Sequence, residues 1–143
     1  MKRLLFTLAT CCVMCACEQK TEMNPFFTEF QTEYGAPDFT KIRLEHYEPA
    51  FLKGIEEQNA EIKAIVDNPE EPTFENTIVA LDKSGGILAR VSGVFFALTE
   101  ADTNDSLTAL NEKMAPVLSE HSDNIYLNQD LYKRVADVQI GRA

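Results

Sequence analysis

The chain has 143 residues, of which 45% are hydrophobic and 25% are charged, and its net charge is −10. This length and balance suit one folded domain and exclude a disordered or low-complexity chain. An acidic surface repels phosphate backbones, so we expect no nucleic-acid partner. All cysteines lie in the first 17 residues, so the rest of the chain offers no thiol for a disulfide or a metal: Cys11, Cys12, Cys15 and Cys17.

Residues 1–17 have the pattern of a bacterial lipoprotein signal. Lys2 and Arg3 form a short basic start, and residues 4–16 are an uncharged apolar run. This run is shorter than the ~20 residues that span a bilayer but has the length of the apolar part of a signal peptide. Because Ala16 directly precedes Cys17, we expect cleavage between them and lipidation of Cys17. The alternatives are ordinary secretory cleavage after Ala16 and an uncleaved anchor.

Lipidation predicts a protein exported to the cell envelope of a bacterium and held on a membrane, on its periplasmic or outer-membrane face. Several acyl chains on one cysteine bind a membrane firmly, whereas a single chain binds only marginally. Residues 18–45 follow as a polar tether and an extended arm, because Pro25, Gly35 and Pro37 exclude a long helix there. The arm is rich in aromatic residues, which predicts that it lies on a helical surface: Phe26, Phe27, Phe30, Tyr34 and Phe39.

Residues 46–143 have the pattern of an all-α domain, and no alternating strand pattern of useful length appears. Apolar residues recur on one helical face from about Tyr47 to Asn68, with Pro49 near the start, where a helix tolerates proline. Thr73 is expected to cap a further helical pattern that runs from Phe74 to Leu98. Two glycines interrupt that pattern and predict a bend or the close approach of a neighbouring helix: Gly85 and Gly86.

Two further helices are expected in the last third of the chain. A polar turn at residues 102–105 supplies a cap, and apolar residues then repeat at helical spacing from Leu107 to Leu118. Pro116 lies inside this pattern and predicts a kink or a restart of the helix. Asn128 is expected to cap a last short helix whose apolar residues are Leu131, Val135 and Val138.

The sequence contains no complete catalytic or metal site. A zinc hydrolase needs about three protein ligands and a general base, yet the chain has only two histidines, His46 and His121, and no H-E-x-x-H motif. Each histidine follows a glutamate, but adjacent side chains diverge on a helix. We therefore expect local capping or salt bridging at both, no catalytic, cofactor-binding or metal-ligating residue, and Cys17 as the one site residue.

Three strings carry a resemblance to a known family. They are NPFF at residues 24–27, EHYEPAF at residues 45–51 and PTFENTI at residues 72–78. Together they resemble the N-terminal region of the thimet-oligopeptidase-like zinc metallopeptidases, in the branch of peptidyl-dipeptidase Dcp and oligopeptidase A. The resemblance covers about residues 24–140.

The resemblance implies an almost wholly helical enzyme whose two halves enclose a channel. An H-E-x-x-H helix and a further glutamate hold zinc in such enzymes, which release dipeptides from the C-terminus of short peptides. The positions that match the catalytic motif would lie beyond residue 143. The chain is therefore expected to be the N-terminal helical portion of such a peptidase, a piece of its channel wall that is inactive without the C-terminal catalytic half.

Two other interpretations remain open. One is a stand-alone, lipid-anchored helical binding module without catalysis, which would present a groove to a partner. The other is a coiled-coil oligomer built on heptads, but the Gly85-Gly86 pair and Pro116 would break its seam.

Overall fold

A computed structural model describes residues 23–140 of the chain, so the expected signal, Cys17 and most of the tether lie outside the described residues. Every regular element between residues 23 and 140 is helical, which confirms the all-α class. Two short 3₁₀ turns precede one π-helical segment and five α-helices: η1 (Pro25–Phe27), η2 (Glu33–Gly35), α1 (Leu44–Val66), η3 (Phe74–Val79), α2 (Ala80–Lys83), α3 (Gly86–Ala101), α4 (Asp105–Tyr126) and α5 (Gln129–Ile140).

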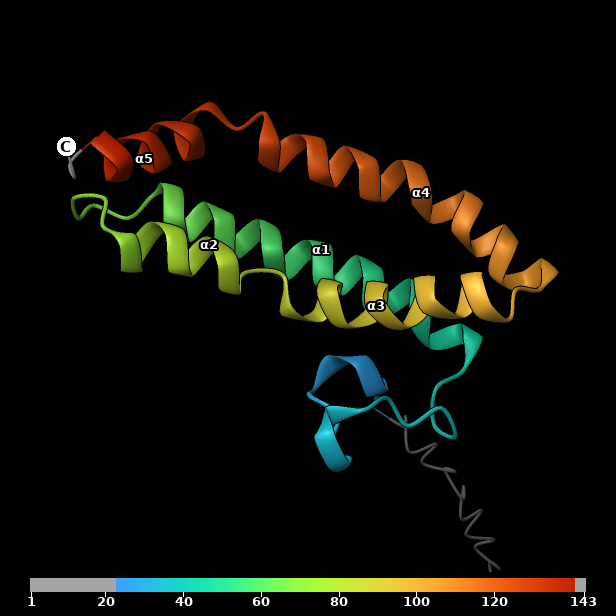
Figure 1. Cartoon of the computed structure of the whole chain (residues 1–143). Coiled ribbons are helices and arrows are strands. Elements are labelled where there is room, and N and C mark those ends of the chain that lie inside the picture. The colour runs from blue at the N-terminus through green and yellow to red at the C-terminus, as the bar shows by residue number, and fades with distance from the viewer. Residues whose placement is uncertain (1–22, 141–143) are drawn as a thin grey trace, which may run out of the picture.

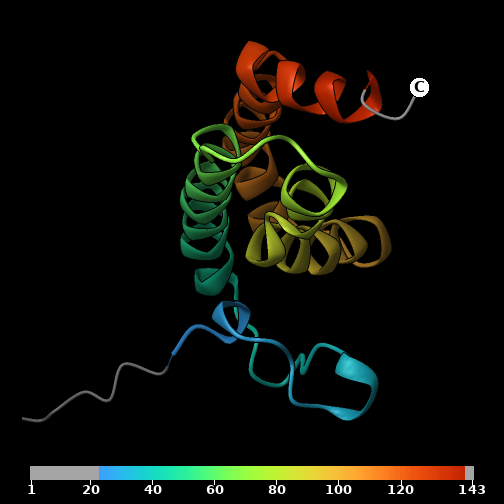
Figure 2. The same cartoon turned by 90° about the vertical axis from the view of Figure 1, so that its left-hand side faces the viewer.

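Helix α1 is the central element of the arrangement (Figure 1). Helix α3 packs along the first part of α1, and η3 with α2 continues along its second part. Helices α4 and α5 follow another side of α1, so that α1 forms the floor between two rows of helices (Figure 2). The arm lies at the end where α1 begins, and η1 contacts both α1 and α3.

The larger of two hydrophobic clusters lies at the arm end of α1. Phe26 of η1 is fully buried there, with its ring 5.2 Å from that of Tyr47, and Phe95 of α3 lies 5.3 Å from both Tyr47 and Phe51. Arg90 donates from Nη1 to the Phe26 carbonyl at 2.8 Å, which fixes the arm to α3. Rings at these separations stabilise one another beyond their burial, so the arm completes the core.

Only part of the arm is buried. Phe26 and Phe30 pack against the larger cluster, as the arm's composition predicts. By contrast, Phe27, Tyr34 and Phe39 are exposed, and Tyr34 is 96% exposed. The arm therefore contributes its first aromatic residues to the core and presents the others to solvent.

A second, smaller cluster lies at the far end of α1. Ile62 and Ile65 of α1 pack there with Leu131 of α5, and Leu81 of α2 borders them. Arg134 of α5 donates from Nη1 to the Asn68 carbonyl at 2.7 Å and from Nη2 to the Glu70 carbonyl at 3.2 Å. These two hydrogen bonds hold the loop between α1 and η3 against α5.

The predicted caps are present. Thr73 Oγ1 accepts from the Asn76 amide at 3.1 Å, and Asn76 Oδ1 accepts in return from the Thr73 amide at 2.8 Å. Asn104 Oδ1 accepts from the second and third amides of α4, and Asn128 Oδ1 accepts from the amides of Asp130 and Leu131. Each cap satisfies amides that the first turn of a helix leaves unpaired.

Pro49 lies deeper in its helix than predicted, and Pro116 does not restart its helix. Helix α1 begins at Leu44, so Pro49 lies beyond its first turn, and α4 continues through Pro116 without a restart. Both prolines are exposed. The carbonyl group that each deprives of a partner can therefore bind water, which lowers the cost of an internal proline.

The two glycines at the α2–α3 junction mark a break in the helical pattern, as predicted. Helix α2 ends at Lys83, and Gly85 adopts a φ of 75°, in the left-handed region that favours glycine. Helix α1 also approaches this junction closely, because a Cβ atom at Gly85 would lie 2.6 Å from the Gln58 side chain. A second close approach lies at Gly54 of α1. A Cβ atom there would lie 2.7 Å from the backbone nitrogen of Leu88, so α1 and α3 approach each other where α1 has no side chain.

Candidate functional site

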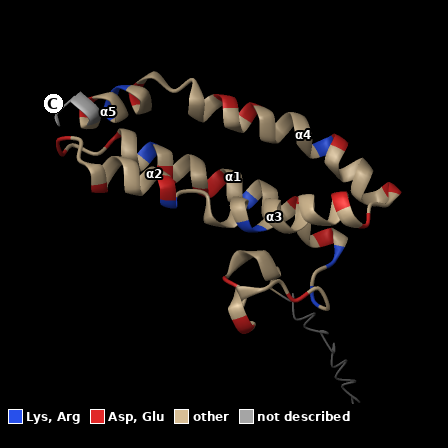
Figure 3. Cartoon of the chain, in the orientation of Figure 1, with Lys and Arg blue, Asp and Glu red and all other residues tan. Residues whose placement is uncertain are grey.

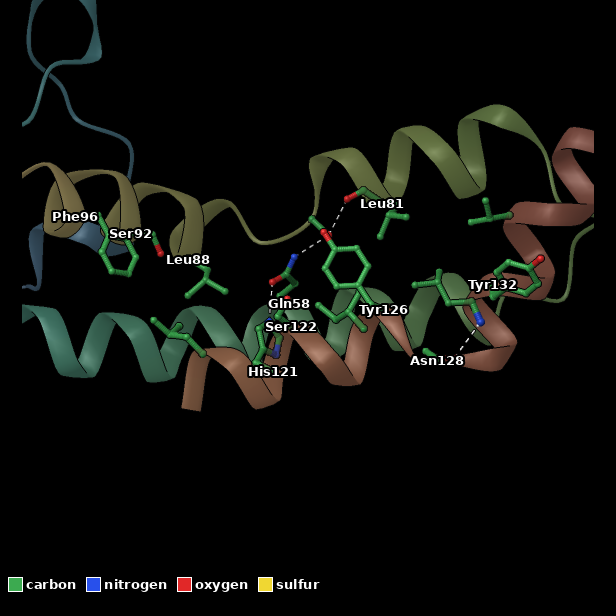
Figure 4. Close-up of a pocket in the computed structure, with 15 residues that line it drawn as sticks. Gln58, Leu81, Leu88, Ser92, Phe96, His121, Ser122, Tyr126, Asn128 and Tyr132 are labelled. Carbon is green, nitrogen blue, oxygen red and sulfur yellow. Dashed lines mark hydrogen bonds between the residues drawn. The ribbon is translucent and has the colours of Figure 1, made fainter. Parts of the chain in front are cut away.

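A groove of about 580 Å³ lies over α1, between a side formed by α2 and α3 and a side formed by α4 and α5 (Figure 4). None of its lining residues is an aspartate, glutamate, lysine or arginine. Most of its surface is apolar, contributed by residues that come from both sides: Leu81, Leu88, Phe96, Leu118, Ile125, Leu131 and Val135.

A chain of hydrogen bonds crosses the middle of this groove. His121 Nε2 of α4 lies 2.7 Å from Gln58 Oε1 of α1, and Gln58 Nε2 donates to Ser84 Oγ at 3.2 Å. Ser84 Oγ donates in turn to the Leu81 carbonyl at 2.8 Å. Because the Gln58 amide oxygen only accepts, this arrangement assigns the proton of the imidazole to Nε2.

His121 is buried, with 6% of its surface exposed. Burial lowers the pKa of this imidazole, because the charged form loses more hydration than the neutral form. His121 is therefore neutral near pH 7 and acts as a hydrogen-bond donor that joins α4 to α1. The expectation of a local interaction holds at His46, whose Nδ1 accepts from the Arg43 amide at 3.1 Å, whereas the hydrogen bond of His121 reaches a different helix.

The α2–α3 junction is held in place by α1. Glu61 Oε2 accepts from the Gly85 amide at 2.7 Å, three residues along α1 from Gln58. A Cβ atom at Gly85 would lie 2.6 Å from the Gln58 side chain, so the junction passes directly over that amide group. Glu61 and Gln58 together fix Ser84 and therefore the side of the groove that α2 and α3 form.

The arrangement is suited to binding a ligand. Apolar side chains cover most of the groove, and Ser92 and Ser122 offer polar atoms along it. Tyr126 and Tyr132 also line it and are largely exposed. Pockets of this volume, mostly apolar with a few polar groups, are typical of ligand sites. No His, Cys, Asp or Glu side chains in the described part of the chain form a group of three or more that could hold a metal ion.

Sequence reasoning did not identify Gln58. Its signal is positional: it lies four residues after Gly54 and four before Ile62, on the buried face of α1, where the pattern otherwise places small or apolar residues. A polar side chain at such a position needs a partner. The partners come from α4 and from the α2–α3 junction, and periodicity along one helix cannot reveal them.

The lipidation prediction is not addressed by these elements, because Cys17 lies outside residues 23–140. Across that described range, no helix has both the length and the apolar character needed to cross a membrane.

Comparison with known proteins identifies peptidases as relatives. The chain is 49% identical over 115 residues to dipeptidyl carboxypeptidase of Escherichia coli (strain K12), and 46% identical over 112 residues to the protein of the same name from Salmonella typhimurium. It is 28% identical over 118 residues to oligopeptidase A of Escherichia coli. No family model matches the chain.

These matches cover most of this chain but little of each relative. The aligned residues make up 80% of the chain and 17% of the Escherichia coli dipeptidyl carboxypeptidase, and 82% and 17% for oligopeptidase A. The chain thus spans about a sixth of the length of the curated relatives it matches. The resemblance carried by the NPFF, EHYEPAF and PTFENTI strings is confirmed.

Proposed function

Because the chain is homologous to dipeptidyl carboxypeptidase and, more distantly, to oligopeptidase A, we propose that it serves as the N-terminal helical portion of a peptidyl-dipeptidase. In this role it forms part of the wall of the channel that admits short peptides. The enzyme it serves releases dipeptides from the C-terminus of those peptides. The observation that carries this proposal is the 49% identity over 115 residues, together with a groove suited to binding.

Zinc belongs, in this proposal, to a catalytic portion that these residues do not supply. The described residues do not fit a zinc site. His46 lies near the start of α1, and His121 is engaged with Gln58 within the groove. Neither belongs to a group of three His, Cys, Asp or Glu side chains within the described part of the chain. The catalytic portion is the main partner proposed for this chain, and the chain contributes shape and binding surface to it.

The first experiment exchanges the matching segment of a relative. The 115 aligned residues of the Escherichia coli dipeptidyl carboxypeptidase would be replaced by the corresponding residues of this chain, and dipeptide release from a quenched fluorescent substrate would be measured. We expect the chimaera to retain activity, with KM changed more than kcat, because the exchanged segment binds and guides but does not react. A folded, zinc-loaded chimaera without activity would contradict the proposal.

The second experiment tests the chain alone. We expect the purified chain, from Glu18 onward, neither to bind zinc in a stoichiometric amount nor to cleave the same substrate, because the ligands and the general base are missing. Zinc-dependent cleavage by this polypeptide would contradict the proposal that the zinc ligands and the general base lie outside it.

We further propose that the protein is exported and lipid-anchored through Cys17 in a bacterial cell envelope. The support is the sequence alone: a basic start, a short apolar run and Ala16 directly before the cysteine. Metabolic labelling with a fatty acid should mark the wild-type protein and not the Cys17→Ala variant. Equal labelling of both proteins would exclude this attachment site.

A further inference from the structure

The groove over α1 differs in charge from the chain that forms it. The chain carries a net charge of −10, yet no charged residue lines the groove. The ligand surface that enters must therefore be uncharged, because an unpaired charge would lose its hydration there. Any charged groups of the ligand must remain at the edges.

Helix α4, which forms part of one side of the groove, carries more acidic than basic residues (Figure 3). From Leu118 to Tyr126, the part of α4 that lines the groove, the charged residues are Glu120 and Asp123, and both are exposed. From Leu88 to Ala101 of α3 the charges of Arg90 and Glu100 balance one another. The opposite charges of α5 balance one another, as do Asp82 and Lys83 of α2. The potential beside the groove is therefore negative and reaches ~8 Å at physiological ionic strength.

We infer that the groove binds short cationic peptides, with two or three apolar side chains lying in the groove and lysine or arginine residues outside it. The class of ligand, a short peptide, rests on the proposed function. The apolar and cationic character of the peptide rests on the groove itself. The stretch of α4 from Leu118 to Tyr126 spans ~12 Å, which is the length of about four residues of an extended peptide.

Polar atoms within the groove can serve the backbone of such a peptide. Ser92 of α3 and Ser122 of α4 lie on opposite sides, and Asn128 lies between α4 and α5 (Figure 4). The Gln58 amide is already engaged with His121 and Ser84. It therefore shapes the floor, and Asn128 Oδ1 is engaged in capping α5, so the two serines remain for the ligand.

The test uses the mature chain from residue 17, with Cys17→Ser, and three fluorescein-labelled peptides of equal length. One alternates leucine with lysine, one alternates leucine with glutamate, and one alternates alanine with lysine. Fluorescence anisotropy should show binding of the leucine–lysine peptide that weakens as salt is added. The leucine–glutamate and alanine–lysine peptides should each bind at least about tenfold more weakly, a difference of ~1.4 kcal/mol.

Two matched variants separate the groove from a general attraction to an acidic surface. Ser122 lines the groove, whereas Ser119, on the same helix, is exposed and does not line it. We expect Ser122→Glu to weaken binding of the leucine–lysine peptide by about tenfold or more, because it places a charge among apolar side chains. Ser119→Glu should leave that binding unchanged or strengthen it.

Several outcomes would overturn the inference. These are equal binding of the three peptides, stronger binding by both glutamate variants, or self-association of the chain that buries the groove. Should Ser122→Glu fail to fold, NMR titration of the unsubstituted chain takes its place, and the amide signals of Ser92 and Ser122 must shift with peptide. None of these measurements uses zinc or cleavage, so failure here leaves the chimaera experiment as a separate test of the proposed function.

Discussion

The contact between Gly54 and Leu88 sets the distance between α1 and α3. The nearest atoms to a Cβ at Gly54 are the backbone nitrogen and Cα of Leu88, at 2.7 and 2.9 Å. Backbone atoms in a helix cannot move aside as the end of a flexible side chain can. Gly93 of α3 offers a control, because a Cβ there would meet nothing within 4 Å.

We expect Gly54→Ala to lower the free energy of unfolding by about 1–3 kcal/mol, because the added methyl group forces the two helices apart. Gly93→Ala should raise it by up to ~1 kcal/mol, because alanine favours a helix more than glycine does. Urea denaturation followed by circular dichroism measures both. A neutral Gly54→Ala variant would mean that α1 and α3 do not pack this closely.

His121 should make the folded state sensitive to acid. In the unfolded chain an imidazole binds its proton near pH 6.5, whereas burial lowers the pKa of His121 in the folded chain. Below about pH 6.5 the unfolded state therefore binds more protons, and the free energy of unfolding falls as the pH is lowered.

The measurement compares urea denaturation near pH 7.5 and near pH 5.5 for the wild-type chain and for His121→Gln. The variant keeps a side-chain amide that can donate to Gln58 but does not titrate, so its stability should change less between these conditions. His46 is present in both proteins and cancels in the comparison. Identical pH dependence would show that His121 remains accessible to solvent.

At the scale of helices, the caps and periodicity predicted most of the fold. Thr73 and Asn128 mark helix starts because their side chains act within three residues, a range that a linear sequence displays directly. The start of α1 was predicted too late, so Pro49 lies inside the helix, and Pro116 does not restart α4. The cost of an internal proline depends on whether the carbonyl group that loses its partner can bind water. The groove was not predicted, since Gln58, Ser84 and His121 come from segments far apart in the sequence.

Helix α5 should depend on its cap. Asn128→Ala removes the acceptor for the amides of Asp130 and Leu131, and we expect a loss of ~1 kcal/mol in the free energy of unfolding. Hydrogen exchange should increase first in α5, which contacts α1 and η3. Asn124→Ala, at an exposed position within α4, is the control and should have little effect. Equal effects of the two substitutions would argue against a specific cap.

At the scale of the whole molecule, residues 23–140 leave several large apolar side chains exposed to solvent. Large apolar or aromatic side chains are exposed on the arm and on α1, η3, α3, α4 and α5, among them Leu52, Phe74, Phe96 and Val117. Where such side chains lie next to one another, they mark an interaction site or a liability to aggregate. This exposure fits a helical portion that contacts a larger partner, as the proposed function requires.

We expect the folded chain to bind an apolar fluorescent dye at neutral pH and the leucine–lysine peptide to displace part of that dye. Addition of a chelator should leave the melting temperature unchanged, because the proposed function places zinc in the catalytic portion and not in this fold. A melting temperature that falls with chelator would reveal a metal site. Absence of dye binding would show that the apolar surface is covered, for example by self-association.

The burial of Phe26 has a mechanical consequence. It lies nine positions after Cys17, and a fully extended chain of that length reaches ~30 Å at most. If acyl chains fix Cys17 in a lipid leaflet, a force on the tether acts on Phe26, whose ring is buried in the larger hydrophobic cluster. The same force acts on the hydrogen bond between the Phe26 carbonyl and Arg90. Tension would therefore act first on the larger hydrophobic cluster, and Phe26 would remain within about 30 Å of the lipid surface.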